Sequence, residues 1–221
     1  MDVAIVKYNA GNIYSVINAL KRLGIEPILT DNAEQLAKAN RVLFPGQGEA
    51  STAMAYLKEH GLDLVIKDLR QPVLGICIGQ QLMCRHSQEG NVDCLGIFPL
   101  DVLRFQPEKH NDKVPQMGWN SIHELQSPLF KDINDGEFIY NVHSYYVPYH
   151  KDYTIATCDY ILPYSAALHK DNFYATQYVD DEQSVVFLCK NANLFYNDNF
   201  IHINLNGLDK DAKYEFEFEG K

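Results

Sequence analysis

The sequence predicts an α/β fold built on a parallel β-sheet with flanking helices. Over the first 85 residues, short apolar runs alternate with segments whose apolar residues recur at helical spacing. Strands and helices that alternate in this way form a parallel sheet with right-handed crossovers. The last of these apolar runs leads directly into Cys77, and ligands of such sheets bind at the carboxyl ends of the strands.

The elements of this half are expected in a repeated order of strand and helix. The first strand covers residues 3–6, and the first helix has Asn12 as its N-cap and ends at Gly24. The elements that follow are expected at 25–29 (strand), 33–39 (helix), 41–44 (strand), 54–57 and 62–69 (helical segments) and 73–76 (strand).

Segments rich in β-forming residues replace this alternation after about residue 95. Strands are expected at 102–105, 119–125, 138–147 and 153–158, followed by a hairpin that joins 166–168 to 173–177. From Tyr178 the composition changes again, and alternating apolar residues predict strands where a doubly wound domain normally ends in a helix. We therefore expect a body, residues 1–177, and a foreign β-rich tail, residues 178–221.

The composition excludes several classes of function. The 221 residues include 19 Lys and Arg against 29 Asp and Glu, and a net charge of −10 disfavours nucleic acid as a partner. Because no apolar run reaches the length of a membrane span and no secretory signal begins the chain, we expect a cytoplasmic protein without a membrane partner. Five cysteines without C-x-x-C spacing favour neither disulfides nor zinc, and no metal or cofactor is expected.

The segment Gly75-Ile76-Cys77-Ile78-Gly79 has the G-x-C-x-G pattern of a nucleophile elbow, a sharp turn from strand to helix. Glycines flank such a turn because a Cβ would clash there. A helix that begins at Ile78 aims backbone N–H groups at the sulfur, which is expected to lower the thiol pKa and to stabilise an oxyanion. The pattern alone also fits an inert cysteine that ends a buried strand.

A second loop, residues 44–49 (FPGQGE), leaves the preceding strand at the same edge of the predicted sheet. Its glycine backbone can turn an N–H group toward a developing oxyanion. Pro-Gly turns are common, so this loop by itself also fits a plain strand-to-helix turn. Two such loops on consecutive parallel strands favour a catalytic site around Cys77.

Five motifs occur in the order seen in class I glutamine amidotransferases: 7–12 (KYNAGN), 44–48 (FPGQG), 75–83 (GICIGQQLM), 115–120 (PQMGWN) and 142–146 (VHSYY). Residues 1–177 resemble in particular the glutaminase subunits of imidazole glycerol phosphate synthase. The resemblance implies a flavodoxin-like, mixed sheet and a Cys77 that attacks the carboxamide of glutamine, forms a glutamyl thioester and releases ammonia. It also implies a heterodimer with the cyclase subunit, a (β/α)₈ barrel that uses this ammonia in histidine biosynthesis.

The same resemblance implies roles for further residues. They are the oxyanion-hole residues Ile78, Gln47 and Gly48, the glutamine-binding residues Gln81, Glu89, His143, Ser144 and Tyr145, and the cyclase-facing residues Trp119 and Tyr140.

The resemblance fails at the general base. The family has a His-Pro-Glu segment directly after the strand at 173–177, and this chain continues instead with Tyr178-Val179-Asp180-Asp181. A valine cannot move a proton, and a general acid–base group typically supplies about 10²–10⁴ in rate. Two hypotheses stay open: a glutaminase subunit with impaired turnover, and a non-catalytic module that docks on the cyclase or binds glutamine without turnover.

The tail resembles a fragment of the C-terminal β-sandwich of bacterial α-galactosidases, over residues 178–187 and 206–214. Such a sandwich follows the catalytic barrel, so no glycosidase carboxylate pair accompanies it. A third hypothesis, a carbohydrate-binding β-module, rests on this tail alone.

Overall fold

The computed structural model describes residues 2–8, 13–46, 48–110 and 112–177, so every prediction for residues 178–221 lies outside the described residues. The helices are α1 Ile13–Arg22, α2 Ala33–Lys38, α3 Ala50–Glu59, α4 Leu62–Asp68 and α5 Ile78–Met83, with a 3-10 turn at Pro128–Phe130. The strands are β1 Val3–Val6, β2 Ile28–Thr30, β3 Arg41–Gly46, β4 Val73–Cys77, β5 His86–Ser87, β6 Val92–Asp93, β7 Asp101–Arg104, β8 Gln116–Ser121, β9 Phe138–His143, β10 Tyr145–Tyr146, β11 Thr154–Tyr160, β12 Leu162–Lys170 and β13 Phe173–Thr176.

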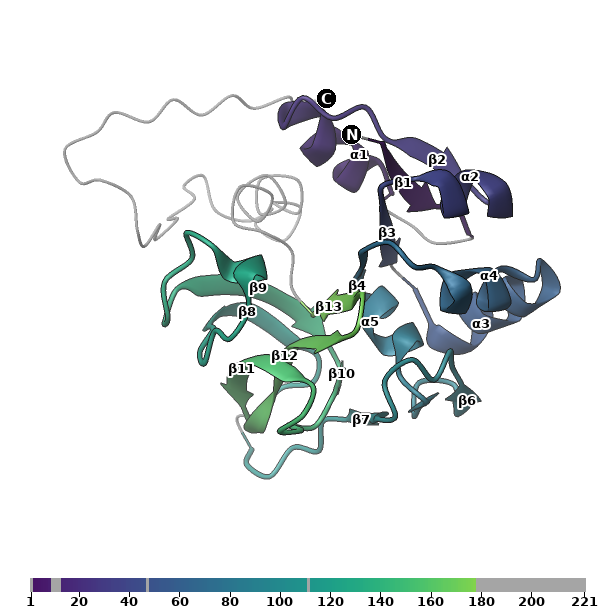
Figure 1. Cartoon of the computed structure of the whole chain (residues 1–221). Helices are drawn as coiled ribbons and strands as arrows, with labels where there is room; N and C mark the ends of the chain where they lie inside the picture. The colour runs from purple at the N-terminus through teal and green to yellow at the C-terminus, as the bar shows by residue number, and fades with distance from the viewer. Residues whose placement is uncertain (1, 9–12, 47, 111, 178–221) are drawn as a thin grey trace, which may run out of the picture.

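The central sheet has the strand order β11-β12-β13-β4-β3-β1-β2 among the described residues (Figure 1). Strands β2, β1, β3, β4 and β13 pair in parallel, which confirms the parallel sheet expected for the first half. Strands β12 and β11 add to it in antiparallel fashion, so the whole sheet is mixed. Because β4 lies in the middle of the order, its C-terminal residue Cys77 emerges at the centre of the carboxyl edge.

Two smaller sheets complete the described fold: a four-stranded sheet in the order β10-β7-β5-β6 and the β8-β9 hairpin. The sequence pattern does not predict β5 and β6, because strands of two residues are too short to show an alternation. The expected strands begin three residues later than β8 and four residues later than β12. The expected continuous strand at 138–147 is wrong, since the chain breaks between β9 and β10.

Two hydrophobic clusters hold these layers together. The larger packs α2, α3, α4 and α5 against the central sheet, through fully buried side chains that include Leu36, Leu57, Ile66 and Leu82. The smaller lies under β8, β9, β11 and β12 and is built around Tyr164. Each buried aliphatic side chain contributes about 1.5–3 kcal/mol, so these clusters supply most of the stability that positions the edge of β4.

Helix α1 is less buried than its sequence pattern predicts. Of the apolar residues at helical spacing, Ile13 alone is buried, and Val16, Ile17 and Leu20 are partly exposed. Leu23, which follows the helix, is 71% exposed. The predicted N-cap Asn12 lies outside the described residues.

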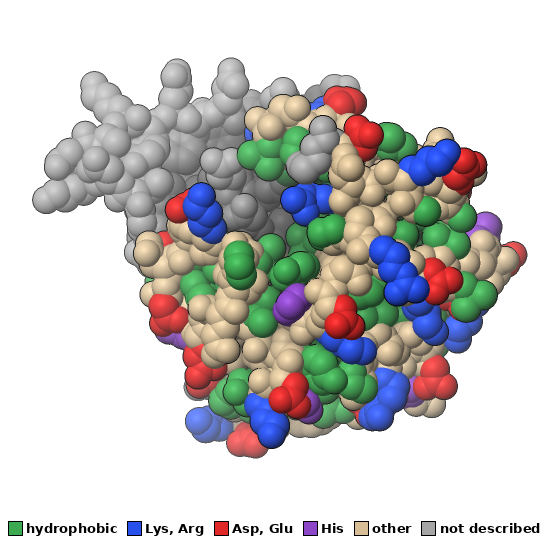
Figure 2. All heavy atoms as spheres, in the orientation of Figure 1, with side chains coloured by type: hydrophobic (Ala, Val, Ile, Leu, Met, Phe, Trp, Pro, Cys, Tyr) green, Lys and Arg blue, Asp and Glu red, His purple; other side chains and the backbone are tan. Residues whose placement is uncertain are grey.

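The charged side chains of the described surface carry both signs. Figure 2 shows Lys and Arg interspersed with Asp and Glu over the described part of the visible face. Several form exposed ion pairs, such as Arg85 with Asp101 at 2.7 Å, and such pairs add about 0–1 kcal/mol each. Among the described helices, none is long and apolar enough to cross a membrane.

Candidate active site

Cys77 occupies a strained turn between β4 and α5. Its φ of 55° and ψ of −111° are rare for a residue with a side chain, and strain of this kind is typical of functional sites. A Cβ on Gly79 would lie 1.8 Å from the Phe44 carbonyl oxygen, and one on Gly75 would lie 2.9 Å from the backbone of Gly79. The turn therefore has the geometry that the G-x-C-x-G pattern predicts, and glycine is needed at both flanks.

The loop at residues 44–49, which we call the glycine loop, lies directly beside this turn. Gly46 pairs with Cys77 in the parallel register of β3 and β4, so the carboxyl ends of the two strands meet at one place, as predicted. Gly48 has a φ of +132°, which side chains rarely adopt. The predicted oxyanion-hole residue Gln47 lies outside the described residues.

Tyr8 contacts this loop through its side chain. It belongs to the motif at 7–12, but the sequence predicts no role for it. Its buried hydroxyl donates a hydrogen bond of 2.8 Å to the carbonyl oxygen of Pro45. A Cβ on Gly46 would lie 2.0 Å from the Tyr8 hydroxyl and from Cγ2 of Ile78. The loop therefore packs tightly between Tyr8 and Ile78, the first residue of α5. Burial raises the pKa of Tyr8, so its hydroxyl keeps the proton that it donates to Pro45.

The expected lowering of the Cys77 thiol pKa is wrong. The backbone N–H of Ile78 does favour the thiolate, as predicted, but the loss of solvent around the sulfur outweighs it and raises the pKa to about 11. The negative charge of Glu89 raises it further. Cys77 nevertheless keeps intermediate solvent exposure, so the residue is not sealed in the core.

Two predicted glutamine-binding residues lie close to this turn. Glu89 accepts a hydrogen bond of 3.2 Å from the backbone N–H of Ala50, the first residue of α3, directly after the glycine loop. Burial raises the Glu89 pKa, and the Ala50 N–H opposes this effect. Gln81, on α5, is buried, and its Oε1 has no hydrogen-bond partner among the described residues. An unpartnered buried oxygen is costly, so a ligand that donates a hydrogen bond there gains binding energy.

The other predicted glutamine-binding residues, 143–145, lie where β9 ends and β10 begins. His143, at the end of β9, donates a hydrogen bond of 2.8 Å from its Nδ1–H to the carbonyl oxygen of Tyr145. Its Nε2 lies 3.3 Å from the Tyr164 hydroxyl. The Ser144 carbonyl accepts from Phe105 N–H at 3.0 Å, which fixes the segment against the strand β7 and the residue after it. His143 is therefore held by structural partners on both ring nitrogens.

Stability is expected to fall between about pH 6.5 and pH 4 because of His143. Burial lowers the pKa of this imidazole to about 4, whereas an unfolded chain protonates it near 6.5. The unfolded state then binds more protons in this window, so acidification favours unfolding. The free energy of unfolding is expected to fall by about 2 kcal/mol between pH 7 and pH 5. Urea unfolding of the wild type and of His143→Asn at both pH values measures the effect.

In His143→Asn this part of the pH dependence is lost. An equal fall in stability in His143→Asn and the wild type would contradict the assignment.

Trp119 and Tyr140 lie opposite each other on the β8-β9 hairpin, with their rings in a T-shaped contact at 5.5 Å. Met117 pairs with Val142 on the same face, and these two side chains are 60% and 42% exposed. Phe138, at the end of the hairpin, is 46% exposed. An exposed apolar face of this kind is typical of a protein interface, and we call it the hairpin face.

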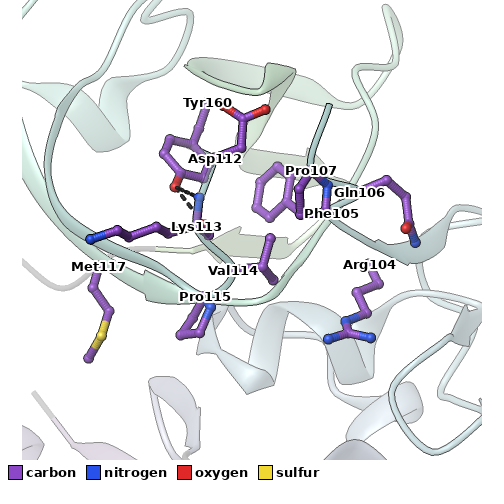
Figure 3. A pocket seen from close by; sticks show the side chains of 10 residues that line it. All are labelled: Arg104, Phe105, Gln106, Pro107, Asp112, Lys113, Val114, Pro115, Met117 and Tyr160. Carbon is purple, nitrogen blue, oxygen red and sulfur yellow. Dashed lines mark hydrogen bonds between the residues drawn. The ribbon is translucent and has the colours of Figure 1, made fainter. Parts of the chain in front are cut away.

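A cavity of about 810 Å³ opens beside the hairpin face, and Cys77 does not line it. Figure 3 shows that Met117 and Lys113 line one side and Arg104 another, and that the Tyr160 hydroxyl hydrogen-bonds the backbone of Lys113. None of the predicted glutamine-binding residues lines it. Among the described residues, no group of three His, Cys, Asp or Glu side chains is placed to hold a metal ion.

Gln177 is, after Tyr8, a second residue near Cys77 for which the sequence predicts no role. It follows the last residue of β13, and its Nε2 lies 3.9 Å from the Cys77 sulfur. The signal lay in the pairing of β13 with β4, which a single sequence does not show.

Comparisons with known proteins give a consistent match. The family model described as "Glutamine amidotransferase class-I" matches residues 4–178. The chain is 64% identical over 178 residues to "Imidazole glycerol phosphate synthase subunit HisH" of Bacteroides fragilis (strain YCH46), covering 80% of this chain and 90% of that protein. It is 40% identical over 193 residues to the subunit of the same name from Neisseria meningitidis serogroup B, covering 80% and 91%. A solved glutamine amidotransferase from Thermotoga maritima matches with a TM-score of 0.60 at 13% identity, covering 90% of this chain and 86% of that one.

Proposed function

The chain belongs to the class-I glutamine amidotransferase family, and we propose that it is the glutaminase subunit of an imidazole glycerol phosphate synthase. In this role it hydrolyses glutamine to glutamate and ammonia, and hands the ammonia to a cyclase subunit in histidine biosynthesis in the cytoplasm. The observation that carries the proposal is the strained turn at Cys77, in register with Gly46 of the glycine loop.

The chemistry follows from this arrangement. The sulfur of Cys77 adds to the carboxamide carbon of glutamine, and the carbonyl oxygen becomes an oxyanion. Backbone N–H groups of Ile78 and the glycine loop donate hydrogen bonds to it and stabilise its charge. The carbon–nitrogen bond then breaks, and the amide nitrogen leaves as ammonia with the proton of the thiol. Water attacks the thioester carbon, which releases glutamate and returns Cys77 to the thiol.

Gln81 and Glu89 fit the head of the substrate. The free Oε1 of Gln81 and the partly buried carboxylate of Glu89 both accept hydrogen bonds, as an α-ammonium group requires. The backbone at Ser144 and Tyr145 is the place proposed for the α-carboxylate. We assign no acid–base role to His143, because both of its nitrogens already have partners.

A second function is favoured by one feature of the sequence and one of the structure. Val179 stands where the family has its base histidine, and the raised thiol pKa leaves about one molecule in a thousand as thiolate at pH 8. Both features favour a module that docks on the cyclase and binds glutamine but turns over slowly or not at all.

Mixing the chain with its cyclase subunit and glutamine separates the two functions. Glutamate that accumulates over many turnovers, and that Cys77→Ala abolishes, supports the glutaminase. One glutamyl group on Cys77 without further release supports intact acylation with absent deacylation, and binding without any acylation supports the docking module.

The hairpin face is the surface we propose for the cyclase. Trp119→Ala is expected to weaken the complex by about thirtyfold, or about 2 kcal/mol, because a partly exposed Trp in an aromatic pair is a typical hot spot of an interface. Titration calorimetry with the cyclase subunit measures it. Tyr149→Ala is the matched control, since Tyr149 is 54% exposed but lies outside the hairpin face. Equal affinities of the two variants would place the interface elsewhere.

A further inference from the structure

Gln177 lies beside Cys77 because β13 and β4 run in parallel. The last pair in their register is Thr176 with Ile76, so the next residues of the two segments, Gln177 and Cys77, are neighbours at the sheet edge. The Gln177 amide nitrogen Nε2 lies 3.9 Å from the sulfur, within the range of a hydrogen bond to sulfur. The two residues are 100 positions apart in the chain, and the fold alone brings them together.

The backbone of Gln177 is hydrogen-bonded and its side chain is buried. Its backbone N–H donates to the Ala166 carbonyl at 2.9 Å, and the residue is 4% exposed. Its Oε1 has no hydrogen-bond partner among the described residues. The side chain is therefore not part of a structural network like those of most buried glutamines, and its amide contact is with the nucleophile.

Two side chains near the sulfur do not stabilise a negative charge on it. The Tyr8 hydroxyl donates to the Pro45 carbonyl, and Glu89 carries a charge of the same sign as a thiolate. The backbone N–H of Ile78 is a donor that favours the thiolate. The Gln177 amide adds a side-chain donor to this backbone donor.

We propose that Gln177 hydrogen-bonds the sulfur of Cys77 through Nε2–H and so stabilises the thiolate that attacks glutamine. The inference rests on the proposed function of Cys77 as the nucleophile. It adds a thiolate-stabilising side chain from the strand segment that precedes the divergent residues 178–181. A hydrogen bond to the charged form of a group shifts its ionisation toward that form.

Alkylation of Cys77 by iodoacetamide in the full chain tests this without requiring turnover. Only the thiolate reacts, so the rate between pH 7 and pH 9 follows the thiolate fraction. Gln177→Met keeps the length of the side chain and removes the donor, and it is expected to lower the rate about tenfold, which corresponds to an increase of about 1 in the thiol pKa. Gln177→Glu, which removes the donor and adds a negative charge, is expected to lower it further.

Peptide mass spectrometry resolves Cys77 from the other cysteines. The rate at Cys94, a partly exposed thiol, is the internal control for folding in each variant. Gln71→Met is the matched control, because Gln71 precedes β4 at the opposite end from Cys77 and bonds the Leu36 carbonyl. An unchanged Cys77 rate in both Gln177 variants, with Cys94 also unchanged, would overturn the inference.

The outcome is separate from that of the proposed function. If the Gln177 variants slow alkylation but the wild type forms no glutamyl thioester with glutamine and the cyclase, the contact stands and the glutaminase assignment fails. If the thioester forms and the variants alkylate like the wild type, the assignment stands and the role of Gln177 fails.

Discussion

Glutamine hydrolysis is expected to rise by about 10²–10⁴-fold when Val179-Asp180-Asp181 is replaced by His-Pro-Glu and a helix of the family type replaces the residues that follow. The physical reason is proton transfer. The Cys77 thiol has a pKa of about 11, so it rarely ionises unaided near neutral pH, and the amide nitrogen of the substrate leaves poorly until it is protonated and can depart as ammonia. An imidazole next to the sulfur takes the thiol proton and returns it to the leaving nitrogen.

The measurement is steady-state glutamate release in the presence of the cyclase subunit. The same replacement in a Cys77→Ala chain is the control, and it is expected to show no release. No gain in the repaired chain would mean that the body, residues 1–177, is defective at another place.

Gly79→Ala is expected to destabilise the fold by about 3 kcal/mol or more. The added Cβ would lie 1.8 Å from the Phe44 carbonyl oxygen, which belongs to β3, and neither the strand nor the first turn of α5 can move without breaking the packing between them. Because Phe44 is the first residue of the glycine loop, any shift also displaces that loop relative to Cys77. Urea unfolding followed by circular dichroism measures the loss.

Gly24→Ala is the control for this substitution. A Cβ on Gly24 meets nothing within 4 Å, but its φ of +73° is unfavourable for alanine, so a loss of about 1 kcal/mol is expected from backbone strain alone. Equal losses for the two variants would contradict the close approach of α5 to β3.

The parts of the site that depend on local pattern could be predicted from the sequence. The turn at Cys77 follows from an apolar run, a G-x-C-x-G pattern and the start of a helix, and the position of Gly46 beside it follows from the rule that consecutive strands of a parallel sheet end at one edge. The general arrangement of the central sheet follows from the same alternation.

The parts of the site that depend on tertiary surroundings could not be predicted from the sequence. The direction in which the Cys77 pKa shifts depends on two opposing effects. The backbone N–H of Ile78 lowers the pKa and the loss of solvent around the sulfur raises it, and only the packed structure shows that the second effect is larger. The contact of Gln177 with Cys77 requires the register of β13, and the hydroxyl of Tyr8 on Pro45 joins residues 37 positions apart. His143 was placed among the substrate residues, and the structure adds that Tyr145 and Tyr164 bind both its nitrogens.

The most direct test is whether glutamine acylates Cys77. The chain is mixed with its cyclase subunit and glutamine, quenched in acid, and digested for mass spectrometry of the peptide that holds residue 77. A glutamyl group on this cysteine, absent when Cys77 is replaced by alanine, is the predicted result. An unmodified Cys77 after saturation with glutamine and cyclase, or a glutamyl group on another cysteine, would contradict the nucleophile at the centre of this account.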